Sequence, residues 1–382
     1  MKDIQTFERC LKDFEYFKDF QGFLDPRDNG QKRRIPLKRK LVRFNPLNDL
    51  NENQFRIKYR FSKESLRRII EIVRDDLEIE YYEPLKREQV PIDLQILSAI
   101  RLWGGTEHPK LTAMAHGVSL RTLAKITRRV ASVLASKASR YIRMPATLSE
   151  KERIMCSFQA IANMPQVIGA LLQTTVRFLP ENSGSYLSED DPDGESTYPA
   201  QSNEELHLQI VCDAAHKIRD LDIRLIDEHS MASDAEMFAL SKIRDRFEQN
   251  EFRGRILLGS EIVRCSSSLY TPVRFPRNQS EELYNHAHST TYASARKCLS
   301  LLMSRFGVLG TEILGSQSSA KQTITALSIL HNMAMEWADP SIDSELHVSP
   351  YKSTFFNAMT NVSKSGEDNN RKQFIKTHFA SQ

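Results

Sequence analysis

The stretch PQVIGALLQTTV, Pro165 to Val176, marks the point where the sequence changes from helical to mixed patterning. Its uncharged apolar run, VIGALL (167–172), predicts a short buried strand. That strand is expected to end at Leu172, where the polar residues Gln173 and Thr174 begin. The chain before this stretch and the chain after it are therefore expected to fold differently.

Strands alternate with helices beyond this stretch. HLQIVCDA (207–214) and DLDIRLID (220–227) read as two strands, and the short link between them predicts a hairpin. Ser233 is placed to cap a helix over 233–247. The other expected elements are a strand over 255–260 and long helices over about 289–309 and 319–337. This order predicts a mixed α/β (α+β) domain.

Helical spacing dominates before Pro145. Apolar residues recur at helical spacing in SKESLRRIIEIVRDDL (62–77), and PIDLQILSAIRLW (91–103) begins with a proline that suits a first turn. A short helix over 111–115 is then broken at His116-Gly117, and Ser119 caps a longer helix. This order is typical of a helix-turn-helix.

The second helix of that pair has one basic face, formed by Arg121, Lys125, Arg128 and Arg129. These residues are candidates for DNA contact, since a recognition helix enters the major groove. Packing within a helical bundle is the equally weighted alternative, because many helical pairs turn at a glycine without touching DNA.

Shifts in composition divide the chain into four regions. We expect a basic, largely flexible arm over 1–54, a helical helix-turn-helix region over 55–145, a mixed domain over 146–340, and a flexible tail over 341–382. The mixed domain contains a turn-rich acidic insertion near 181–203, which we interpret as an exposed loop. Docking of this insertion to a basic partner is the alternative.

The composition limits the classes of protein that the chain can form. It has 382 residues, a net charge of +4 and no apolar segment long enough for a membrane span, so the expectation is a soluble protein without a membrane partner. The N-terminus carries charges throughout and has no apolar signal core. Five cysteines without paired spacing favour reduced thiols and indicate neither a disulfide framework nor a zinc site.

One basic cluster lies in the N-terminal arm, and it contains Lys32, Arg33, Arg34, Lys38, Arg39 and Lys40. Such a run is either a solvated segment or a nuclear localisation signal and phosphate-binding arm, and the two interpretations are compatible. The cluster and the lack of a signal core together favour a nuclear location.

Several motifs together resemble the PIF/Harbinger transposase-derived nuclease family of the DDE superfamily. They are PQVIGAL (165–171), LQIVCDA (208–214), SDAEMF (233–238), LLGS (257–260) followed by TP (271–272), YNHAHS (284–289), SRFGVL (304–309) and ILHNM (329–333). The resemblance runs from about Phe55 to Trp337. It implies an RNase H-like catalytic domain after a helix-turn-helix region.

The resemblance also implies a site at which acidic side chains hold two divalent metal ions for phosphodiester cleavage. At the three positions where the family pattern has acids, this chain has Leu172, Ser260 and Arg296. An aliphatic side chain, a neutral hydroxyl and a cation cannot replace the carboxylates that Mg²⁺ prefers. We therefore expect degenerate catalytic positions, no metal site, no cofactor and no enzymatic activity.

Asp234 is the one acid that survives at a family position. Its place in the first turn of a helix explains it without a metal, because an acid there interacts favourably with the helix dipole. A displaced acidic set of Asp213, Asp234 and Glu261 is the weaker alternative. The pair His286 and His288, like the pair His331-Asn332, is expected to form structural hydrogen bonds, as no ligand spacing accompanies it.

These expectations favour a domesticated, catalytically inactive transposase that acts as a nuclear, chromatin-associated adaptor or scaffold. The resemblance implies a separate Myb/SANT- or MADF-like DNA-binding partner, with DNA itself as a possible ligand. The alternative is a transcription regulator that binds specific DNA directly through its helix-turn-helix, and a residual metal-dependent nuclease comes third. The oligomeric state, the target loci and the direction of regulation stay open.

Overall fold

The computed structural model describes residues 45–79, 90–105, 107–179, 204–225, 234–339 and 369–380. The chain divides into two units, Met1–Arg43 and Phe44–Gln382, and the first lies outside the described residues. The basic cluster at Lys32 to Lys40 and the acidic insertion near 181–203 also lie outside them. Among the helices that the structure describes, none is long and apolar enough to cross a bilayer.

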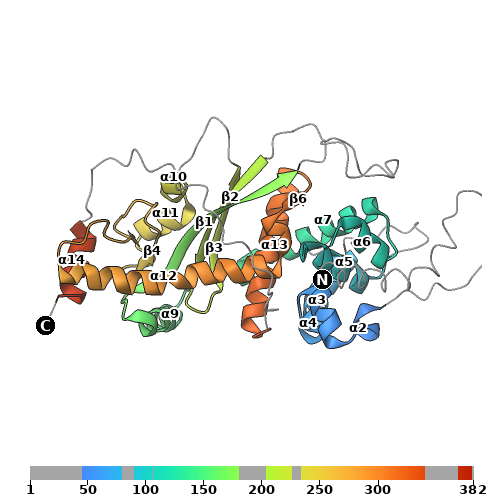
Figure 1. The fold of residues 1–382 in the computed structure, drawn as a ribbon, viewed down its shortest axis with the longest axis horizontal. Coiled ribbons are helices and arrows are strands. Elements are labelled where there is room, and N and C mark those ends of the chain that lie inside the picture. The colour runs from blue at the N-terminus through green and yellow to red at the C-terminus, as the bar shows by residue number, and fades with distance from the viewer. Residues whose placement is uncertain are drawn as a thin grey trace, which may run out of the picture. The chain divides into compact units, whose positions relative to one another are not determined.

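Each element described in the N-terminal part of the second unit is a helix, and the first two begin within 1–54, where the sequence predicts a largely flexible arm. Its helices are α2 (Pro46–Asp49), α3 (Glu52–Tyr59), α4 (Lys63–Ile79), α5 (Ile92–Trp103), α6 (Pro109–Ala115), α7 (Leu120–Ser136) and α8 (Ala138–Tyr141). Side-chain caps start several of them: Asn51 and Gln54 form a capping box on α3, and Ser119 accepts the Thr122 N–H at the start of α7. Helix α5 is buried along most of its length, so it forms the centre of this bundle (Figure 1).

A mixed sheet follows the helices and confirms the expected fold class. Its strands are β1 (Val167–Leu179), β2 (Glu204–Cys212), β3 (Ile218–Leu225), β4 (Ile256–Leu258), β5 (Leu269–Tyr270) and β6 (Glu312–Leu314). The order is β3-β2-β1-β4-β5, with β6 beside the far end of β1. Strands β1 to β3 are antiparallel to their neighbours, whereas β4 and β5 run parallel to β1. This is the arrangement of an RNase H-like domain.

Strand β1 is longer than the sequence predicts, because it does not end at Leu172 but continues to Leu179. Backbone pairing explains the extension, since β1 pairs with β2 as far as Phe178 and with β6 over 177–179. Val176 and Phe178 are buried, whereas Arg177 between them is exposed. This half of β1 therefore alternates like a strand with one face in the core. Leu172 therefore lies in the middle of the strand.

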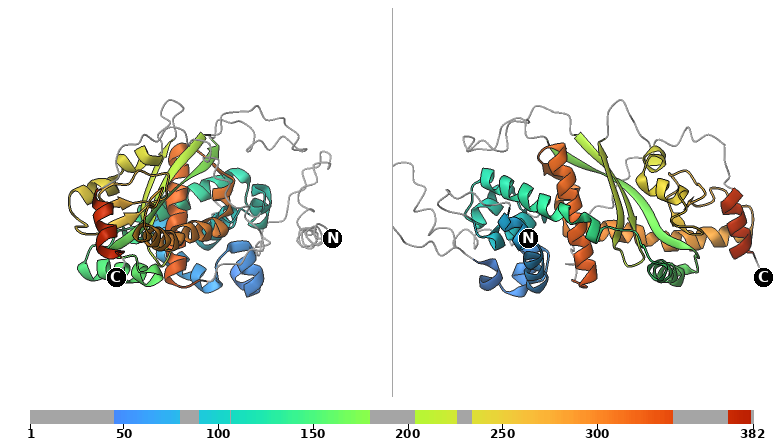
Figure 2. Two further views of the ribbon diagram at one scale, coloured as in Figure 1. Left: turned by 60° about the vertical axis from the view of Figure 1, so that its left-hand side comes forward. Right: turned by 180° about the vertical axis from the view of Figure 1, so that it is seen from behind.

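Helices precede and follow β1 along the chain, in the order expected for this fold. They are α9 (Leu148–Ala162), α10 (Asp234–Ala239), α11 (Lys242–Glu248), α12 (Gln279–Arg305) and α13 (Gln317–Glu336), with a 3-10 turn, η1 (Gly307–Gly310), after α12. The predicted helix over 233–247 is interrupted, because Ser241 starts α11 as a new N-cap. Helix α12 begins earlier than predicted because Asn278 caps it. Figure 2 shows α13 between the sheet and the N-terminal helices.

The helical region and the sheet share one hydrophobic core, so they form a single body. At their junction, the amide of Gly307 donates a hydrogen bond to the carbonyl of Gly104 at 3.2 Å. A Cβ on Gly307 would lie only 2.7 Å from that carbonyl oxygen, and a Cβ on Gly105 would lie 2.6 Å from the backbone of Gly307. The two segments can approach this closely because both are glycine.

A further helix, α14 (Asn369–His378), lies in the region where the sequence predicts a flexible tail. The prediction is wrong for this segment, because Phe374 and Ile375 are buried against the rest of the molecule. Its interior apolar pair was hidden among polar residues, so composition alone did not identify it. The remainder of 341–382 lies outside the described residues, apart from the two residues that follow α14.

Candidate functional site

The predicted catalytic positions meet where β4 ends beside β1. Ala170 pairs with Leu258 in parallel register, so Leu172 and Ser260, two residues further along each chain, come to the same level. Leu172 is 5% exposed and Ser260 is half-buried. The structure therefore brings two of the three positions together in the way that the family resemblance implies.

The third position, Arg296, lies on helix α12, whose residues Ser294 and Cys298 contact His216 in the β2–β3 turn. The hydroxyl of Tyr292 donates a hydrogen bond to the carbonyl of Leu171 at 3.0 Å, which fixes α12 over β1 one residue from Leu172. Arg296 lies one turn further along α12, is exposed, and places its guanidinium 5.7 Å from the centre of the Tyr292 ring. Leu172 and Ser260 therefore lie together at the end of β4, whereas Arg296 lies on the exposed surface of α12.

None of these three residue types is a carboxylate, the ligand type that a two-metal site uses. A guanidinium repels a divalent cation, and neither leucine nor a lone serine hydroxyl offsets the cost of removing water from Mg²⁺. The same guanidinium is suited to hold an anionic group such as phosphate or carboxylate.

Asp234, the surviving acid, is the first residue of α10. Its place at a helix start is the one that the sequence predicts, where a negative charge is favoured by the helix dipole. Whether it has any catalytic role stays a prediction.

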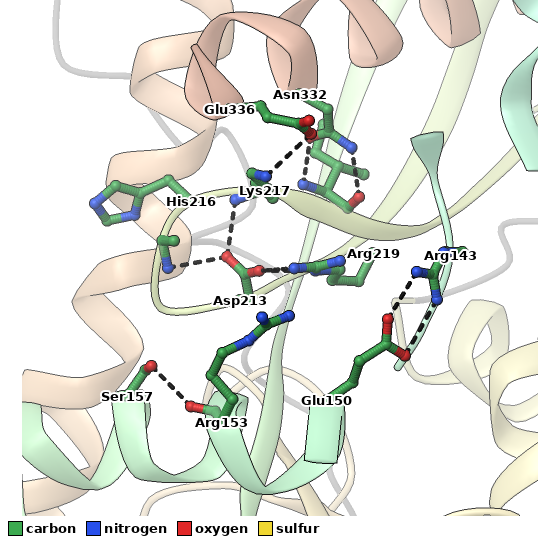
Figure 3. Close-up of polar contacts among 12 residues, drawn as sticks. Arg143, Glu150, Arg153, Ser157, Asp213, His216, Lys217, Arg219, Asn332 and Glu336 are labelled. Atoms are coloured by element: carbon green, nitrogen blue, oxygen red, sulfur yellow. Dashed lines mark hydrogen bonds and ion pairs between the residues drawn. The ribbon is translucent and has the colours of Figure 1, made fainter. Parts of the chain in front are cut away.

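Asp213 belongs to a structural network in the β2–β3 turn (Figure 3). One carboxylate oxygen accepts the backbone N–H groups of Ala215 and Lys217, each at 2.9 Å. The other oxygen accepts the Arg219 Nε–H at 2.7 Å, and the same two side chains form an ion pair at 2.6 Å. With Asp213 only 3% exposed, its carboxylate holds the hairpin and has little capacity left for a metal ion.

Glu261, the remaining member of the displaced acidic set, is exposed beyond the end of β4. Within the described ranges, no group of three or more His, Cys, Asp or Glu side chains is arranged to hold a metal ion. The alternative of a displaced acidic set of Asp213, Asp234 and Glu261 stays a prediction.

The ILHNM motif on α13 secures the same hairpin from the other side. Asn332 accepts the Ile218 N–H at 2.7 Å and donates to the carbonyls of Ile218 and Tyr141 at 2.7 and 2.9 Å. His331 Nε2 lies 2.8 Å from the carbonyl oxygen of His216. Both residues are buried, so the expected structural role of the His331-Asn332 pair is confirmed.

The YNHAHS motif on α12 holds the segment that follows β5. The Tyr284 hydroxyl donates to the carbonyl of Thr271 at 2.9 Å, and Asn285 both accepts the Val273 N–H and donates to the Val273 carbonyl. His288 Nε2 lies 3.0 Å from the carbonyl oxygen of Tyr270. Burial, together with nearby arginines, lowers the pKa of His288 to about 4, so this histidine is neutral at pH 7 and structural.

The four basic candidates on α7 do not share one environment. Arg121 and Lys125 are exposed. Arg129 instead donates to Gln95 Oε1 at 3.2 Å and to the carbonyl of Leu77 in the last turn of α4, and Arg128 Nε lies 3.4 Å from the carbonyl of Ala124. The packing alternative therefore accounts for Arg129. DNA contact stays a prediction, and Arg121 and Lys125 are its exposed candidates.

The turn between α6 and α7 has the expected glycine, but its geometry is fixed from within the bundle. His116 Nε2 lies 3.1 Å from the Tyr59 hydroxyl, and Nδ1 lies 2.9 Å from the carbonyl of Thr112. Gly117 has a φ of 61°, the left-handed conformation in which glycine is favoured. A helix, a turn and a helix are present, but this order does not by itself identify a DNA-binding motif.

One set of exposed residues was missed by the sequence analysis. Arg274, Phe275 and Arg277 lie exposed between β5 and α12, at the same edge of the sheet as Ser260, and Phe275 is 74% exposed. The Arg274 guanidinium lies 5.5 Å from the centre of the Phe275 ring. The run RFPR, with arginines on both sides of an aromatic residue just after a strand, was the signal that could have revealed them.

A family model described as DDE superfamily endonuclease matches residues 189–332. The matched range includes Asp234, Ser260 and Arg296, and it begins after Leu172. The part of the chain from the second strand to the ILHNM motif is thus similar to that superfamily.

Curated relatives extend the similarity over most of the chain. The Rattus norvegicus protein named "Putative nuclease HARBI1" is 24% identical over 313 residues, which cover 79% of this chain and 84% of the relative. The Homo sapiens protein of that name is 23% identical over 313 residues, with the same coverage. The Xenopus laevis protein is 22% identical over 359 residues, which cover 90% of this chain and 94% of the relative.

Similarity to solved structures is weaker. The crystal structure of a pre-cleavage Mos1 transpososome matches 68% of this chain and 79% of its own at 11% identity, with a TM-score of 0.19. The mariner Mos1 paired end complex with Mg has a TM-score of 0.20 at the same identity and covers 72% of this chain and 88% of its own.

Proposed function

We propose that this chain is a catalytically inactive member of the lineage of its curated relatives, because residues 189–332 match a DDE superfamily endonuclease model and the chain is 24% identical to the Rattus norvegicus protein named Putative nuclease HARBI1 over 313 residues. In this proposal the protein acts in the nucleus as a chromatin-associated adaptor or scaffold. A Myb/SANT- or MADF-like partner supplies sequence recognition, and the RNase H-like body recruits other proteins.

The observation that carries the proposal is the set of side chains at the β1–β4 edge. Leu172 and Ser260 lie level with each other at the ends of adjacent segments, and Arg296 is exposed one turn beyond Tyr292 on the helix that contacts β1. Two-metal catalysis needs several carboxylates at this point. The residue types present favour binding over cleavage, because an exposed guanidinium attracts the phosphate or carboxylate of a partner but does not hold Mg²⁺.

The exposed residues between β5 and α12 support a binding role for this edge. Arg274, Phe275 and Arg277 combine positive charge with an exposed aromatic ring, a composition that is enriched in interaction surfaces.

Direct recognition of DNA is the second candidate function. The exposure of Arg121 and Lys125 on α7 favours it, as both cations are free to reach phosphate groups of a duplex. In this case the protein acts as a transcription regulator without an adaptor step.

Affinity purification distinguishes the two functions. The full-length protein and the variant Arg121→Glu/Lys125→Glu are recovered from nuclease-treated nuclear extract, and bound proteins are identified by mass spectrometry. The adaptor function predicts that both forms recover the same Myb/SANT- or MADF-type protein, since nuclease removes bridging DNA and the contact does not use α7.

A second readout measures DNA binding by the same two proteins at several salt concentrations. If the wild-type chain recovers no such partner and binds duplex DNA with a steep salt dependence that the double variant loses, the adaptor proposal is contradicted and the direct regulator is favoured. The exposed variant Lys110→Glu, on neighbouring α6, serves as a control for a single charge reversal outside α7.

A further inference from the structure

Helix α14 is fixed to the body of the protein by one buried arginine. Arg371, which is 8% exposed, donates to the carbonyl of Thr271 at 2.9 Å, to the Thr271 hydroxyl at 3.2 Å and to the carbonyl of Pro272 at 3.0 Å. Thr271 and Pro272 directly follow strand β5. The last described helix of the chain therefore returns to the edge strand of the sheet.

An aromatic cluster completes this contact. The Phe374 ring lies 5.1 Å from Tyr270 and 6.4 Å from Tyr284, both nearly perpendicular to it. The Phe379 ring lies 5.7 Å from Tyr284 in the same relative orientation. Edge-to-face geometry of this kind holds a helix in one orientation, in addition to the stabilisation from buried apolar area. The surface that binds α14, called its seat below, consists of the end of β5 and the first turns of α12.

The balance of energies indicates a helix that is stable only while seated. A helix of this length is marginal in water on its own, so its order depends on docking. Burial of Phe374 and Ile375 favours docking, but the buried guanidinium opposes it because no carboxylate among the described residues pairs with Arg371. The Nε of Arg371 is buried without a hydrogen-bond partner in the described structure. A segment of this kind is expected to have a lower free energy of local opening than the core of the fold.

The seat is also coupled to the exposed surface described above. The carbonyl of Thr271 accepts hydrogen bonds from both Arg371 and Tyr284, and the chain then continues through Arg274 and Phe275 to the start of α12. When α14 leaves its seat, this segment keeps its contacts with α12 but loses those with Arg371. Whether α14 is bound is therefore expected to affect the conformation of the segment that carries Arg274 and Phe275.

We propose that the surface formed by the end of β5 and the first turns of α12 is a docking site for an amphipathic helix, that α14 is its resident occupant, and that the same helix from a second copy of the chain binds there when the resident helix is released. The recognised pattern places Arg371, Phe374 and Ile375 on one face of the helix, and Phe379 follows the last helical residue. This proposal does not depend on whether the protein is an adaptor or a DNA-binding regulator.

The test uses full-length protein and a fluorescent peptide that spans residues 366–382. In Phe374→Ala the resident helix loses its aromatic anchor, so the peptide binds this variant. In the wild-type chain and in Lys376→Ala, whose altered side chain is exposed, the resident helix competes and peptide binding is weaker by on the order of tenfold or more. A peptide that itself carries Phe374→Ala binds on the order of a hundredfold more weakly than the wild-type peptide.

Arg371→Ala is a second variant in which α14 is expected to leave its seat, and such variants are called vacated chains below. It keeps the test decisive if circular dichroism shows that Phe374→Ala does not fold. Equal peptide binding to the wild-type, Lys376→Ala and vacated chains overturns the proposal, as does the absence of binding to both vacated chains. Hydrogen exchange on the unmodified protein gives an independent readout. The α14 amides are expected to exchange much faster than those of α13, and equal protection of the two helices also overturns the proposal.

Discussion

Arg305 and Asp339 form the most deeply buried ion pair that the described residues contain. Their side chains are 2% and 0% exposed, and the two charged groups are 2.9 Å apart. Arg305 also donates to the carbonyl of Arg60 at 2.6 Å, while Asp339 accepts from the backbone and hydroxyl of Ser62. Burial acts to raise the pKa of Asp339, but hydrogen bonds from Ser65, Ser62 and Arg305 outweigh it and keep the pKa below its usual value.

Substitution of Arg305 by Ala is predicted to be strongly destabilising. The change leaves the Asp339 carboxylate buried without its partner, which costs about 3 to 5 kcal/mol in the free energy of unfolding. Urea denaturation followed by circular dichroism measures this loss. Arg68→Ala, which breaks an exposed pair with Glu64, serves as the control and is expected to change stability by less than about 1 kcal/mol. Equal effects of the two substitutions would show that the buried pair does not stabilise the junction.

Two helices are held in place by buried neutral histidines. His116 follows α6 and bonds to Tyr59 and Thr112, and His288 lies within α12 and bonds to Tyr270. Burial, reinforced by nearby arginines, lowers the pKa of each to about 4. In the unfolded chain both titrate near pH 6.5. Below that pH the unfolded chain therefore binds protons that the folded protein does not.

Stability is predicted to fall as the pH is lowered from 7 to about 5. Because the folded pKa values are depressed, the stabilisation is present above pH 6.5 and is lost as the pH falls towards 4, by about 2 kcal/mol for each histidine at pH 5. Urea denaturation at both pH values measures the change. His116→Gln is expected to reduce the pH dependence, whereas His286→Gln, at an exposed site, is expected to leave it unchanged. A stability that does not depend on pH in this window would contradict the account.

Elements with strong local signals were predicted well from the sequence. The β2–β3 hairpin and α7 with its Ser119 cap follow directly from strand alternation and capping chemistry. Elements fixed by distant partners were not. The second half of β1 depends on pairing with β6, and α14 depends on a seat that its own sequence does not reveal. In the same way, Asp213 was recognised as an acid at a strand end, but its partner Arg219 is defined only by the fold of the turn.

The candidate site shows the same division between local and tertiary information. Leu172, Ser260 and Arg296 were identified by resemblance to a family pattern, and the strand register then placed the first two at one level. The exposed residues Arg274 and Phe275 became part of the site only when β5 was seen to end at the same edge. Single residues can thus be assigned from sequence, whereas the surface that they form cannot.

At the scale of the whole molecule, the N-terminal helices and the RNase H-like sheet form one body. Glycine contacts, the Arg305–Asp339 pair and the packing of α13 against α7 join them. A helical region fixed in this way cannot move freely to find DNA while the sheet holds another ligand. This rigidity suits a scaffold that presents two surfaces at a constant separation.

The central claim is that this body no longer cleaves phosphodiester bonds, and a plasmid nicking assay tests it most directly. Full-length protein and the Asp234→Ala variant are incubated with supercoiled plasmid in Mg²⁺ or Mn²⁺, and a metal-free reaction serves as the control. Because Leu172, Ser260 and Arg296 supply no carboxylate at the β1–β4 edge, neither protein is expected to nick the plasmid above the control. Metal-dependent nicking by the wild-type protein that Asp234→Ala abolishes would contradict the claim.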